Sequence, residues 1–323
     1  MRFLVTGGAG FIGSHIVERL LKTGHFVRVL DNFSSGKHEN LNFDPEFKNA
    51  ESYELMVGDI RDFDSCQIAC QDMDYVLHQA ALRSVPKSLE IPYDFNEVNI
   101  NGTLNLLRAC LENKVRRFVF ASSSSIYGEA TSFPEKETDL PLLISPYALT
   151  KLANEYYCRV FSYNYGLETV GLRYFNVFGP RQALDDEYAV VIPKFIHCML
   201  NDQAPPIHGT GKQSRDFTYI DNVVAANILS ATIPNIKCEV FNVACGSDNS
   251  ILNLVDTLNK IMNKAVNPTF TPPRAGDVFR TLADISKIKN MLGYTSKIDF
   301  ETGLRKTVDY FSTVLCTPYT VHK

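Results

Sequence analysis

Apolar residues recur along the first half of the chain in two alternating patterns. Short, nearly continuous apolar runs predict buried strands at 2–6, 26–30, 53–57, 75–78, 118–121 and 169–172. Between them, helical spacing of apolar residues predicts helices over 11–23, 62–70, 93–111 and 147–165, the first of which Gly24 ends. Strands that are nearly continuously apolar and alternate with helices predict an α/β fold, a doubly wound parallel sheet covered on both faces.

The pattern loosens after about residue 174, where prolines interrupt it. We expect this part to form a smaller, loop-rich C-terminal domain that binds the substrate. Two of its segments are expected to return to the first domain, a helix over 220–231 and a strand over 240–244. The predicted division is therefore 1–173 for the first domain, with returning segments near 216–245, and 174–215 with 246–323 for the second.

The composition is that of an ordinary globular protein. Its 323 residues are 45% hydrophobic and 21% charged, which predicts about two domains. The net charge of -4 offers no basic excess for binding nucleic acid. We find no signal peptide and no apolar run of the ~20 residues that a membrane helix needs, so we expect a cytoplasmic protein. The 8 cysteines form no Cys-x-x-Cys pair, which favours free thiols over disulfides or a metal site.

A glycine-rich turn joins the first predicted strand to the first helix. Gly7, Gly10 and Gly13 allow a tight turn, close approach to a pyrophosphate, and close packing of helix on strand. The N-terminus of the helix then offers free N–H groups to the phosphates. Asp31 ends the second strand about 20 residues later, where a carboxylate can bind the adenine ribose. No Arg adjoins Asp31 to accept a 2′-phosphate, so the sequence predicts a Rossmann-type site for NAD rather than NADP.

Other strand ends complete this predicted cofactor site. Asp59 and Ile60 follow the third strand, and Gln79, Ala80 and Ala81 follow the fourth, where small residues let ribose and phosphates approach. The full set of cofactor-binding residues that we predict is Gly7, Gly10, Phe11, Ile12, Gly13, Asp31, Asn32, Ser35, Gly36, Asp59, Ile60, Gln79, Ala80, Ala81, Asn99, Tyr147, Lys151 and Tyr174.

Tyr147 and Lys151 are four residues apart at the start of a predicted helix and therefore share one face. A nearby ammonium and a positively charged nicotinamide ring would stabilise the phenolate and lower the tyrosine pKa, which makes Tyr147 a candidate base. Ser123 follows the strand over 118–121, at the edge of the sheet where substrates bind in doubly wound folds. The sequence therefore predicts Ser123, Tyr147 and Lys151 as the catalytic residues.

These motifs together resemble those of the extended short-chain dehydrogenases/reductases, and specifically the NAD-dependent nucleotide-sugar epimerases and dehydratases. The resemblance extends over nearly the whole chain. Besides the motifs above it includes the runs 173–182 (Arg-Tyr-Phe-Asn-Val-Phe-Gly-Pro-Arg-Gln), 215–217 (Arg-Asp-Phe) and 274–278 (Arg-Ala-Gly-Asp-Val). It implies that Ser123 binds the substrate oxygen, with Ser124 beside it, that Tyr147 removes its proton, and that Lys151 holds the nicotinamide ribose.

The resemblance also implies the residues that bind the nucleotide. Asn176, Arg215 and Arg274 would contact the diphosphate, since a guanidinium suits phosphate oxygens, and Asp277 would bind the uridine ribose. The full predicted substrate set is Arg83, Ser84, Ser123, Ser124, Asn176, Val191, Arg215, Arg274, Asp277 and Thr281. The family further implies a homodimer formed by helices near 93–111 and 147–165.

The family reactions begin alike, with hydride transfer from C4 of the sugar to NAD, and then diverge. A dehydratase usually places Asp and Glu after the strand-end hydroxyl, and a UDP-glucuronate decarboxylase places Glu in that stretch. Ser124 and Ser125 stand there instead. With no further catalytic group, the simplest course is return of the hydride to the opposite face of the 4-keto sugar, which is 4-epimerisation with tightly bound NAD.

The wall of the sugar pocket indicates the substrate. Relatives restricted to UDP-glucose and UDP-galactose carry a bulky Tyr at the position of Thr281, whereas Thr leaves room for an N-acetyl group. The chain therefore resembles UDP-N-acetylglucosamine 4-epimerases, with turnover of UDP-glucose also expected. Arg83 departs from that subgroup, which keeps UDP-glucose or UDP-glucuronate as alternative substrates. An inactive NAD-binding sensor is a remote alternative, which retention of Ser123, Tyr147 and Lys151 disfavours.

Overall fold

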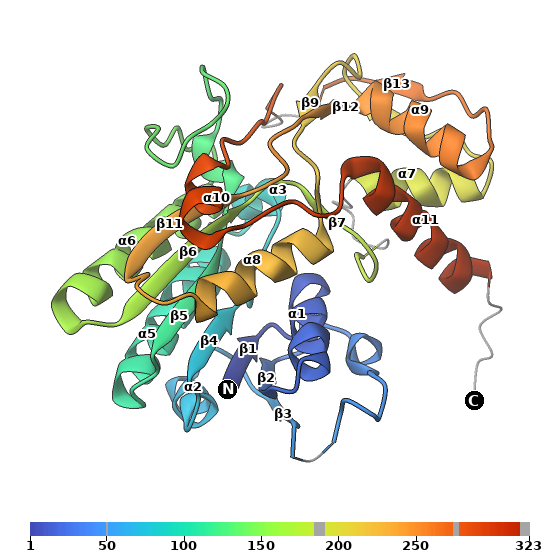
Figure 1. The fold of residues 1–323 in the computed structure, drawn as a ribbon. Helices are drawn as coiled ribbons and strands as arrows, with labels where there is room; N and C mark the ends of the chain where they lie inside the picture. The colour runs from blue at the N-terminus through green and yellow to red at the C-terminus, as the bar shows by residue number, and fades with distance from the viewer. Residues whose placement is uncertain (50, 184–190, 274–277, 317–323) are drawn as a thin grey trace.

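The computed structural model describes residues 1–49, 51–183, 191–273 and 278–316 (Figure 1). Its first half alternates strands and helices as predicted. The strands are β1 (Arg2–Thr6), β2 (Phe26–Asp31), β3 (Tyr53–Val57), β4 (Tyr75–His78), β5 (Arg117–Ser123) and β6 (Glu168–Tyr174). The helical segments are α1 (Phe11–Lys22), η1 (His38–Leu41), α2 (Phe63–Cys70), α3 (Val85–Glu90), α4 (Pro92–Phe95), η2 (Asn96–Asn101), α5 (Gly102–Glu112), η3 (Ser124–Tyr127) and α6 (Pro146–Tyr165).

The strands form one seven-stranded sheet in the order β11-β6-β5-β4-β1-β2-β3. Every neighbouring pair in it is parallel. The seventh strand, β11 (Cys238–Val243), is the segment expected to return from the second half, and it pairs with β6. Helix α8 (Ile220–Thr232) precedes it and is the expected returning helix. The predicted doubly wound parallel sheet is therefore confirmed.

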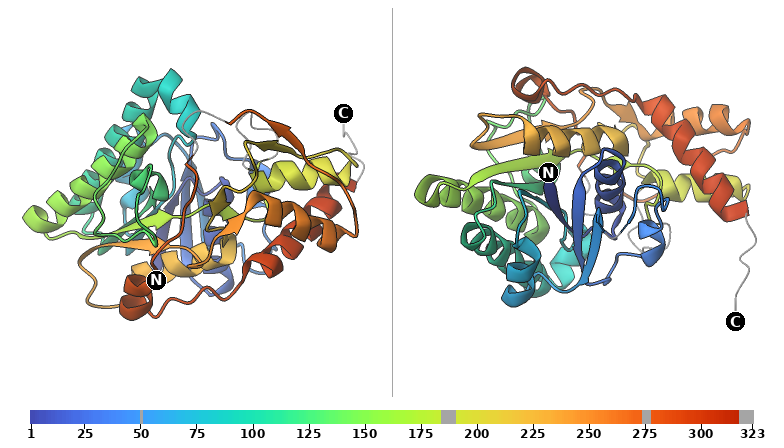
Figure 2. Two further views of the ribbon diagram at one scale, coloured as in Figure 1. Left: turned by 90° about the horizontal axis from the view of Figure 1, so that it is seen from above. Right: turned by 60° about the horizontal axis from the view of Figure 1, so that its bottom comes forward.

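Alternate residues of each strand enter different cores because successive side chains point to opposite faces of a sheet. Phe3 and Val5 of β1 pack with α1 and α8 in one core, whereas Leu4 packs with α2 and α5 in the other. Figures 1 and 2 show α1 and α8 on one face and α2, α5 and α6 on the other. Burial on both faces explains why most positions of the inner strands β1, β4 and β5 are apolar.

The rest of the second half forms a smaller layer beside the carboxyl ends of the strands (Figures 1 and 2). Its short strands are β7 (Val177–Phe178), β8 (Pro206–His208), β9 (Ser214–Arg215), β10 (Thr218–Tyr219), β12 (Asn249–Ser250) and β13 (Thr269–Thr271), paired two by two. Its helices are α7 (Val191–Leu200), α9 (Ile251–Met262) and α11 (Phe300–Cys316), whereas α10 (Ser286–Leu292) packs against β11 of the large sheet.

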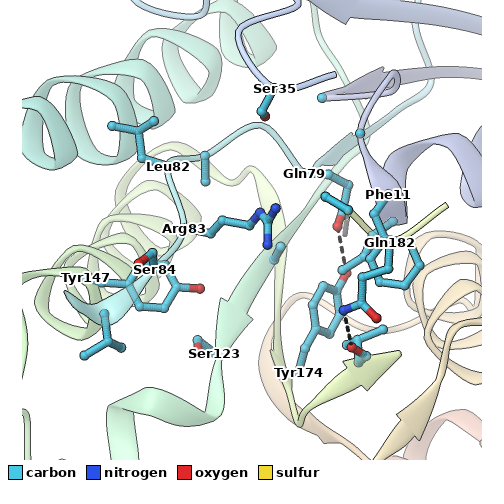
Figure 3. Close-up of a pocket in the computed structure, with 18 of the residues that line it drawn as sticks. Phe11, Ser35, Gln79, Leu82, Arg83, Ser84, Ser123, Tyr147, Tyr174 and Gln182 are labelled. Carbon is cyan, nitrogen blue, oxygen red and sulfur yellow. Dashed lines mark hydrogen bonds between the residues drawn. The ribbon is translucent and has the colours of Figure 1, made fainter. Parts of the chain in front are cut away.

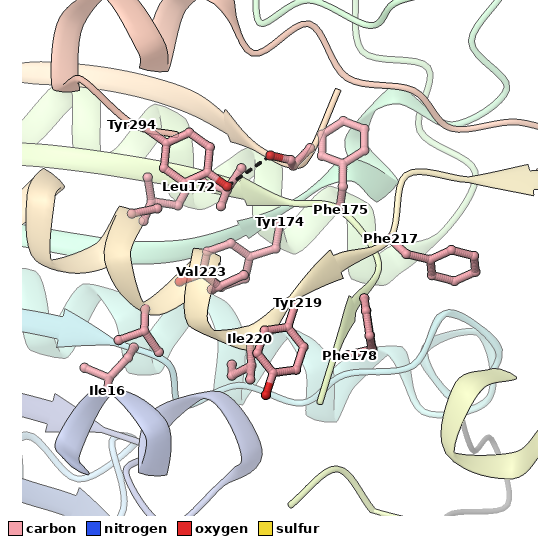
Figure 4. Packing of buried hydrophobic residues seen from close by; sticks show 14 of the residues in the cluster. Ile16, Leu172, Tyr174, Phe175, Phe178, Phe217, Tyr219, Ile220, Val223 and Tyr294 are labelled. Atoms are coloured by element: carbon pink, nitrogen blue, oxygen red, sulfur yellow. Dashed lines mark hydrogen bonds between the residues drawn. The ribbon is translucent and has the colours of Figure 1, made fainter. Parts of the chain in front are cut away.

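An aromatic cluster joins this layer to the sheet. Phe178 packs against both Phe217 and Tyr219, near Ile220 of α8 (Figure 4). Tyr294 donates its hydroxyl to the Ala244 carbonyl at 3.0 Å. These residues and residues of β6 belong to the same hydrophobic core, which therefore extends across the predicted domain boundary. The division into two domains remains a proposal.

Two features differ from or add to the expectation. The helix expected over 93–111 is not a single α-helix, because a π-helical turn, η2, separates α4 from α5. Such turns recur at functional sites, and η2 carries Asn99. No helix within the described ranges is long and apolar enough to cross a membrane.

Candidate active site

A cavity of about 1280 Å³ lies at the carboxyl ends of the strands, between the sheet and the smaller layer. All the described residues predicted to bind cofactor or substrate line it, except Asn99. Arg274 and Asp277 lie outside the described residues. A volume above the range of about 300–1,000 Å³ usual for one small ligand accommodates two, as a cofactor and a nucleotide sugar require.

The glycine turn between β1 and α1 forms one end of this cavity. Gly7 has a φ of +67°, which favours glycine, and a Cβ there would lie 2.7 Å from the Ala80 nitrogen. A Cβ on Gly13 would lie 2.1 Å from the Gly7 carbonyl oxygen. Gly10 caps α1, whose first N–H groups therefore face the turn. The turn is a cradle that any side chain would fill, and it fits the pyrophosphate of NAD.

Acidic side chains at the ends of β2 and β3 line the adenosine end. The Asp31 carboxylate accepts hydrogen bonds from the backbone nitrogens of Ala9 at 2.9 Å and Phe33 at 2.8 Å, which fixes its orientation. Asp59 accepts from Asn32 at 2.8 Å and pairs with Arg61 at 2.7 Å. The Arg61 hydrogen bonds hold the pKa of the Asp59 carboxyl well below its usual range. Both carboxylates are thus held as acceptors for hydroxyl or amino groups.

Ser123, Tyr147 and Lys151 meet at the opposite end of the cavity, where Figure 3 shows Tyr147 and Ser123 beside Arg83. Ser123 ends β5, and its hydroxyl accepts from the Ser125 nitrogen at 3.1 Å. Ser145 caps α6 by accepting from the Ala148 nitrogen, so Tyr147 and Lys151 fall on the first two turns. Lys151 donates to the Ala121 carbonyl at 2.8 Å. The predicted catalytic residues are therefore brought together.

The predicted lowering of the Tyr147 pKa depends on a positively charged nicotinamide ring as well as on Lys151, so it remains a prediction for the protein with NAD bound. Burial raises that pKa, and the Ser123 hydroxyl and the Arg83 charge oppose the effect only in part. Burial also lowers the pKa of Lys151 to about 8. The Lys151 ammonium is bonded to a backbone carbonyl and lies 5.8 Å from the centre of the tyrosine ring. Among the described residues, Ser123 and Arg83 rather than Lys151 are the groups that lower the tyrosine pKa.

The substrate side of the cavity is built by β7, β9 and the segment around Thr281. Asn176 donates to the Thr281 hydroxyl at 3.0 Å and to the Asp216 carbonyl at 3.3 Å. Arg215 is buried, and its guanidinium donates to the carbonyls of Ser214 and Phe279. These contacts fix the Asn176 amide and the Arg215 guanidinium on the cavity wall, where both can bind a diphosphate.

Gln182 is a cavity residue that sequence reasoning did not assign. Its side chain lies near Phe11 and Tyr174 (Figure 3) and is 6% exposed. The amide nitrogen donates to the Val177 carbonyl at 3.0 Å, while the side-chain oxygen is buried without a partner. A buried acceptor without a donor is costly, so we expect a ligand N–H or O–H to occupy it. The only signal in the sequence was its place at the end of the run 173–182.

Two further polar groups support the cavity from behind. Asn99 holds the loop after β4, because its side chain accepts from the Leu82 nitrogen at 2.8 Å and donates to the Leu82 carbonyl at 3.0 Å. Tyr174 donates to Gln79 at 3.1 Å and shares hydrogen bonds with Asn227 of α8. Asn227 was not predicted, because nothing in its local sequence marks a partner 53 residues away.

Comparisons with known proteins agree with this geometry. Residues 3–244 match the model of the NAD dependent epimerase/dehydratase family. The UDP-glucose 4-epimerase of Mycolicibacterium smegmatis is 36% identical over 314 residues, which cover 96% of this chain and 98% of that protein.

Solved structures are similar over the same extent. The UDP-N-acetylglucosamine 4-epimerase of Methanobrevibacter ruminantium in complex with UDP-N-acetylmuramic acid has a TM-score of 0.92 and 43% identity, covering 97% of this chain and 98% of that one. The UDP-glucuronic acid 4-epimerase of Bacillus cereus in complex with UDP-glucuronic acid and NAD has a TM-score of 0.89 and 35% identity, covering 97% and 100%.

The family model matches most of the chain. The matched residues include the glycine cradle, Asp31 and the cluster of Ser123, Tyr147 and Lys151. The predictions of the fold, of NAD as the cofactor and of a nucleotide-sugar epimerase are confirmed. The chain belongs to the NAD-dependent epimerase/dehydratase family, and the similar proteins named above are UDP-sugar 4-epimerases.

Proposed function

We propose that this UDP-sugar 4-epimerase interconverts UDP-N-acetylglucosamine and UDP-N-acetylgalactosamine, and also acts on UDP-glucose and UDP-galactose. Bound NAD would act as the reversible acceptor of the hydride from C4 of the sugar. Tyr147 takes the proton of the C4 hydroxyl and later returns it, while Ser123 binds the same oxygen. Lys151 holds the nicotinamide ribose. Asn176 and Arg215 bind the diphosphate, so the sugar can turn over while its nucleotide stays in place.

The lining of the cavity supports epimerisation over elimination or decarboxylation. Family members that catalyse those reactions usually carry carboxyl side chains after the strand-end serine, where they can act as an acid or a base. Among the described lining residues the acidic ones are Asp31, Glu39, Asp59 and Asp94, and none of them comes from β5, η3 or α6. Ser124 and Ser125 line the cavity at that point instead. The chemistry available there is a single reversible proton transfer.

The proposed preference for an N-acetylated sugar rests on the position and size of the Thr281 side chain. Thr281 lines the cavity, is 6% exposed, and its hydroxyl accepts from Asn176 at 3.0 Å. The side chain is thus fixed against the wall, and its small volume leaves room for an N-acetyl group. A tyrosine at this position would extend into that room.

Arg83 favours UDP-glucuronate as a second candidate. Its side chain projects into the cavity near Tyr147 (Figure 3), and its charge acts on the tyrosine hydroxyl. Since C6 is joined to C5, next to the reacting C4, a carboxylate at C6 would lie within reach of a cation placed there. A guanidinium pairs well with a carboxylate.

Proton NMR of the anomeric region tests the proposal. The purified enzyme is mixed with UDP-N-acetylglucosamine and no added NAD. We expect a second set of signals, from UDP-N-acetylgalactosamine, because the cofactor remains bound. Parallel samples with UDP-glucose and UDP-glucuronate rank the three sugars. Turnover of UDP-glucuronate alone would contradict the proposed sugar while leaving 4-epimerisation intact.

Replacing Thr281 tests the pocket wall directly. We expect Thr281→Tyr to abolish turnover of the N-acetylated sugar and to spare UDP-glucose, because only the former needs the space. Thr281→Ser is the matched control and should act on both substrates. Equal loss of both activities in Thr281→Tyr would show that this wall does not select the sugar.

We also propose that the protein is a homodimer. Large apolar side chains are exposed along one side of α6, namely Leu149, Tyr156, Val160 and Tyr163, with exposed fractions from 47% to 88%. Their spacing of 7, 4 and 3 residues places them on one helical face. Exposure of such an apolar face to water is unfavourable, and packing against the same helix of a second copy would bury it. Size-exclusion chromatography with light scattering measures the mass.

A further inference from the structure

The loop that follows β7, residues 179–182, contacts helix α1 through a charged side chain. The Arg181 guanidinium forms an ion pair with Glu18 and donates to the Ser14 hydroxyl at 3.4 Å. It also lies 5.7 Å above the centre of the Phe43 ring. Arg181 and Glu18 are 163 positions apart and are both largely shielded from solvent, so screening weakens their attraction less than that of an exposed pair.

A second contact joins the same loop to α1. The His15 ring nitrogen Nε2 lies 2.9 Å from the Pro180 carbonyl oxygen. A carbonyl can only accept, so this nitrogen carries the hydrogen. Burial and the charge of Arg181 lower the pKa of His15 to about 4, so the ring is neutral at neutral pH. The loop therefore rests on α1 through one ionic and one neutral contact.

Both partners of this junction serve ligand sites. Helix α1 begins at the glycine cradle, one turn before Ser14. On the other side, Arg181 itself lines the cavity, and the next residue is Gln182 with its unpartnered side-chain oxygen. Arg181 has a φ of +65°, a left-handed conformation that costs a non-glycine residue free energy. The contacts of the Arg181 side chain with Glu18, Ser14 and Phe43 can offset that cost.

We infer that Arg181 is a positioning residue that ties the nucleotide-sugar side of the cavity to the cofactor helix. Its ion pair with Glu18 keeps the loop against α1 and keeps Gln182 directed into the cavity. Movement of the loop away from α1 would open both ligand sites together. The part of this inference that concerns the nucleotide sugar rests on the proposed function, whereas the part that concerns NAD does not.

The test uses the holoenzyme and the variants Arg181→Met, Glu18→Gln and the double variant. Affinity for UDP is measured by calorimetry, and the loss of NAD is followed during repeated gel filtration. We expect each single variant to bind UDP about tenfold more weakly, about 1.4 kcal/mol of binding free energy, and to lose NAD faster. The double variant should be little worse than Arg181→Met, because the Arg181–Glu18 ion pair is already lost in that single variant and the remaining partner of Glu18, Lys22, lies on α1 itself. Arg181→Lys should recover part of the affinity.

Arg305→Met and Glu301→Gln provide a matched control, an exposed ion pair on α11 whose loss should change neither quantity. The inference would be overturned if Arg181→Met kept the wild-type affinity for UDP and retained NAD as the wild type does. It would also be overturned if the loss of UDP affinity in the double variant equalled the sum of the losses in the two single variants. A purely structural role would lower the melting temperature and leave UDP affinity unchanged. If the wild type bound no UDP, the proposed substrate would fail, while the NAD measurement would still decide the role of Arg181.

Discussion

Tyr147 and Lys151 lie one turn apart on α6, and burial favours the uncharged form of both side chains. It raises the pKa of the tyrosine and lowers that of the lysine to about 8. Among the described residues, the Ser123 hydroxyl and the Arg83 charge favour the phenolate. Burial outweighs them and favours the protonated tyrosine, and the positive charge of a bound nicotinamide ring would act in the opposite direction.

Replacing the tyrosine hydroxyl should therefore abolish turnover without unfolding the chain. We expect Tyr147→Phe to lower the epimerisation rate by about 10²–10⁴-fold, the usual contribution of a general acid–base group. The rate is measured by NMR with saturating substrate. Tyr157→Phe, on the exposed side of the same helix, is the control and should keep the wild-type rate. A wild-type rate in Tyr147→Phe would show that Tyr147 is not the acid–base group of the reaction.

Glu135 is a second residue whose protonation burial controls. Its carboxylate accepts from the Leu282 nitrogen at 3.1 Å, beside Thr281. Burial raises its pKa from the ordinary 4.5 to about 8, and the buried Asp216 adds repulsion. Above pH 4.5 the unfolded chain releases this proton while the folded chain keeps it, so stability must fall as pH rises towards 8.

Glu135→Gln should remove that dependence and keep the acceptor. We expect the melting temperature of the variant to rise relative to that of the wild type as the pH increases. The value for the variant minus that for the wild type should be several degrees larger at pH 9 than at pH 5. Each unit of the pKa shift corresponds to about 1.4 kcal/mol. Melting curves at pH 5, 7 and 9 measure the effect. Wild-type and variant curves that stay parallel would show that Glu135 titrates normally.

At the scale of elements, the π-helical turn η2 places Asn99 against the loop after β4. Asn99 is 1% exposed and makes two hydrogen bonds to Leu82, just before Arg83 and Ser84. We expect Asn99→Ala to cost about 1–3 kcal/mol of stability, since buried backbone groups lose partners. It should also raise the KM for the nucleotide sugar more than it lowers kcat.

Urea unfolding and steady-state kinetics give both quantities. Asn101→Ala in the same turn is the control, because its side chain bonds only to Glu97 near the surface. A variant that loses stability but keeps its KM would show that Asn99 supports the fold and does not position the loop.

The elements that could be predicted are those whose determinants are local. Apolar runs and helical periodicity located the strands of the sheet and α8, and glycine spacing located the cradle. The π-turn was missed because its residues show the same periodicity as the helices around it. Arg181 with Glu18, Asn99 with Leu82 and Tyr174 with Asn227 could not be predicted, since each pair depends on how distant segments pack. The effect of burial on the Tyr147 pKa could not be predicted for the same reason, because burial is a property of the folded chain.

At the scale of the whole molecule, the cavity and the exposed apolar face of α6 are separate features of the described chain, since Leu149, Tyr156, Val160 and Tyr163 do not line the cavity. If α6 joins two copies, assembly and catalysis should be separable. We expect the double variant Tyr156→Glu and Val160→Glu to be monomeric, because paired carboxylates cannot be buried in an apolar interface. Both residues are exposed in the single chain, so the fold should survive.

Light scattering and NMR kinetics on the same sample test this separation. The monomer should keep turnover within about twofold of the wild type, and its melting temperature should lose any dependence on protein concentration. Phe270→Glu, an exposed apolar residue on β13, is the control and should leave the dimer intact. A wild type that is already monomeric would contradict the proposed dimer. A monomeric variant without activity would instead mean that the partner contributes to the cavity, through the packing of α6 behind Tyr147 and Lys151.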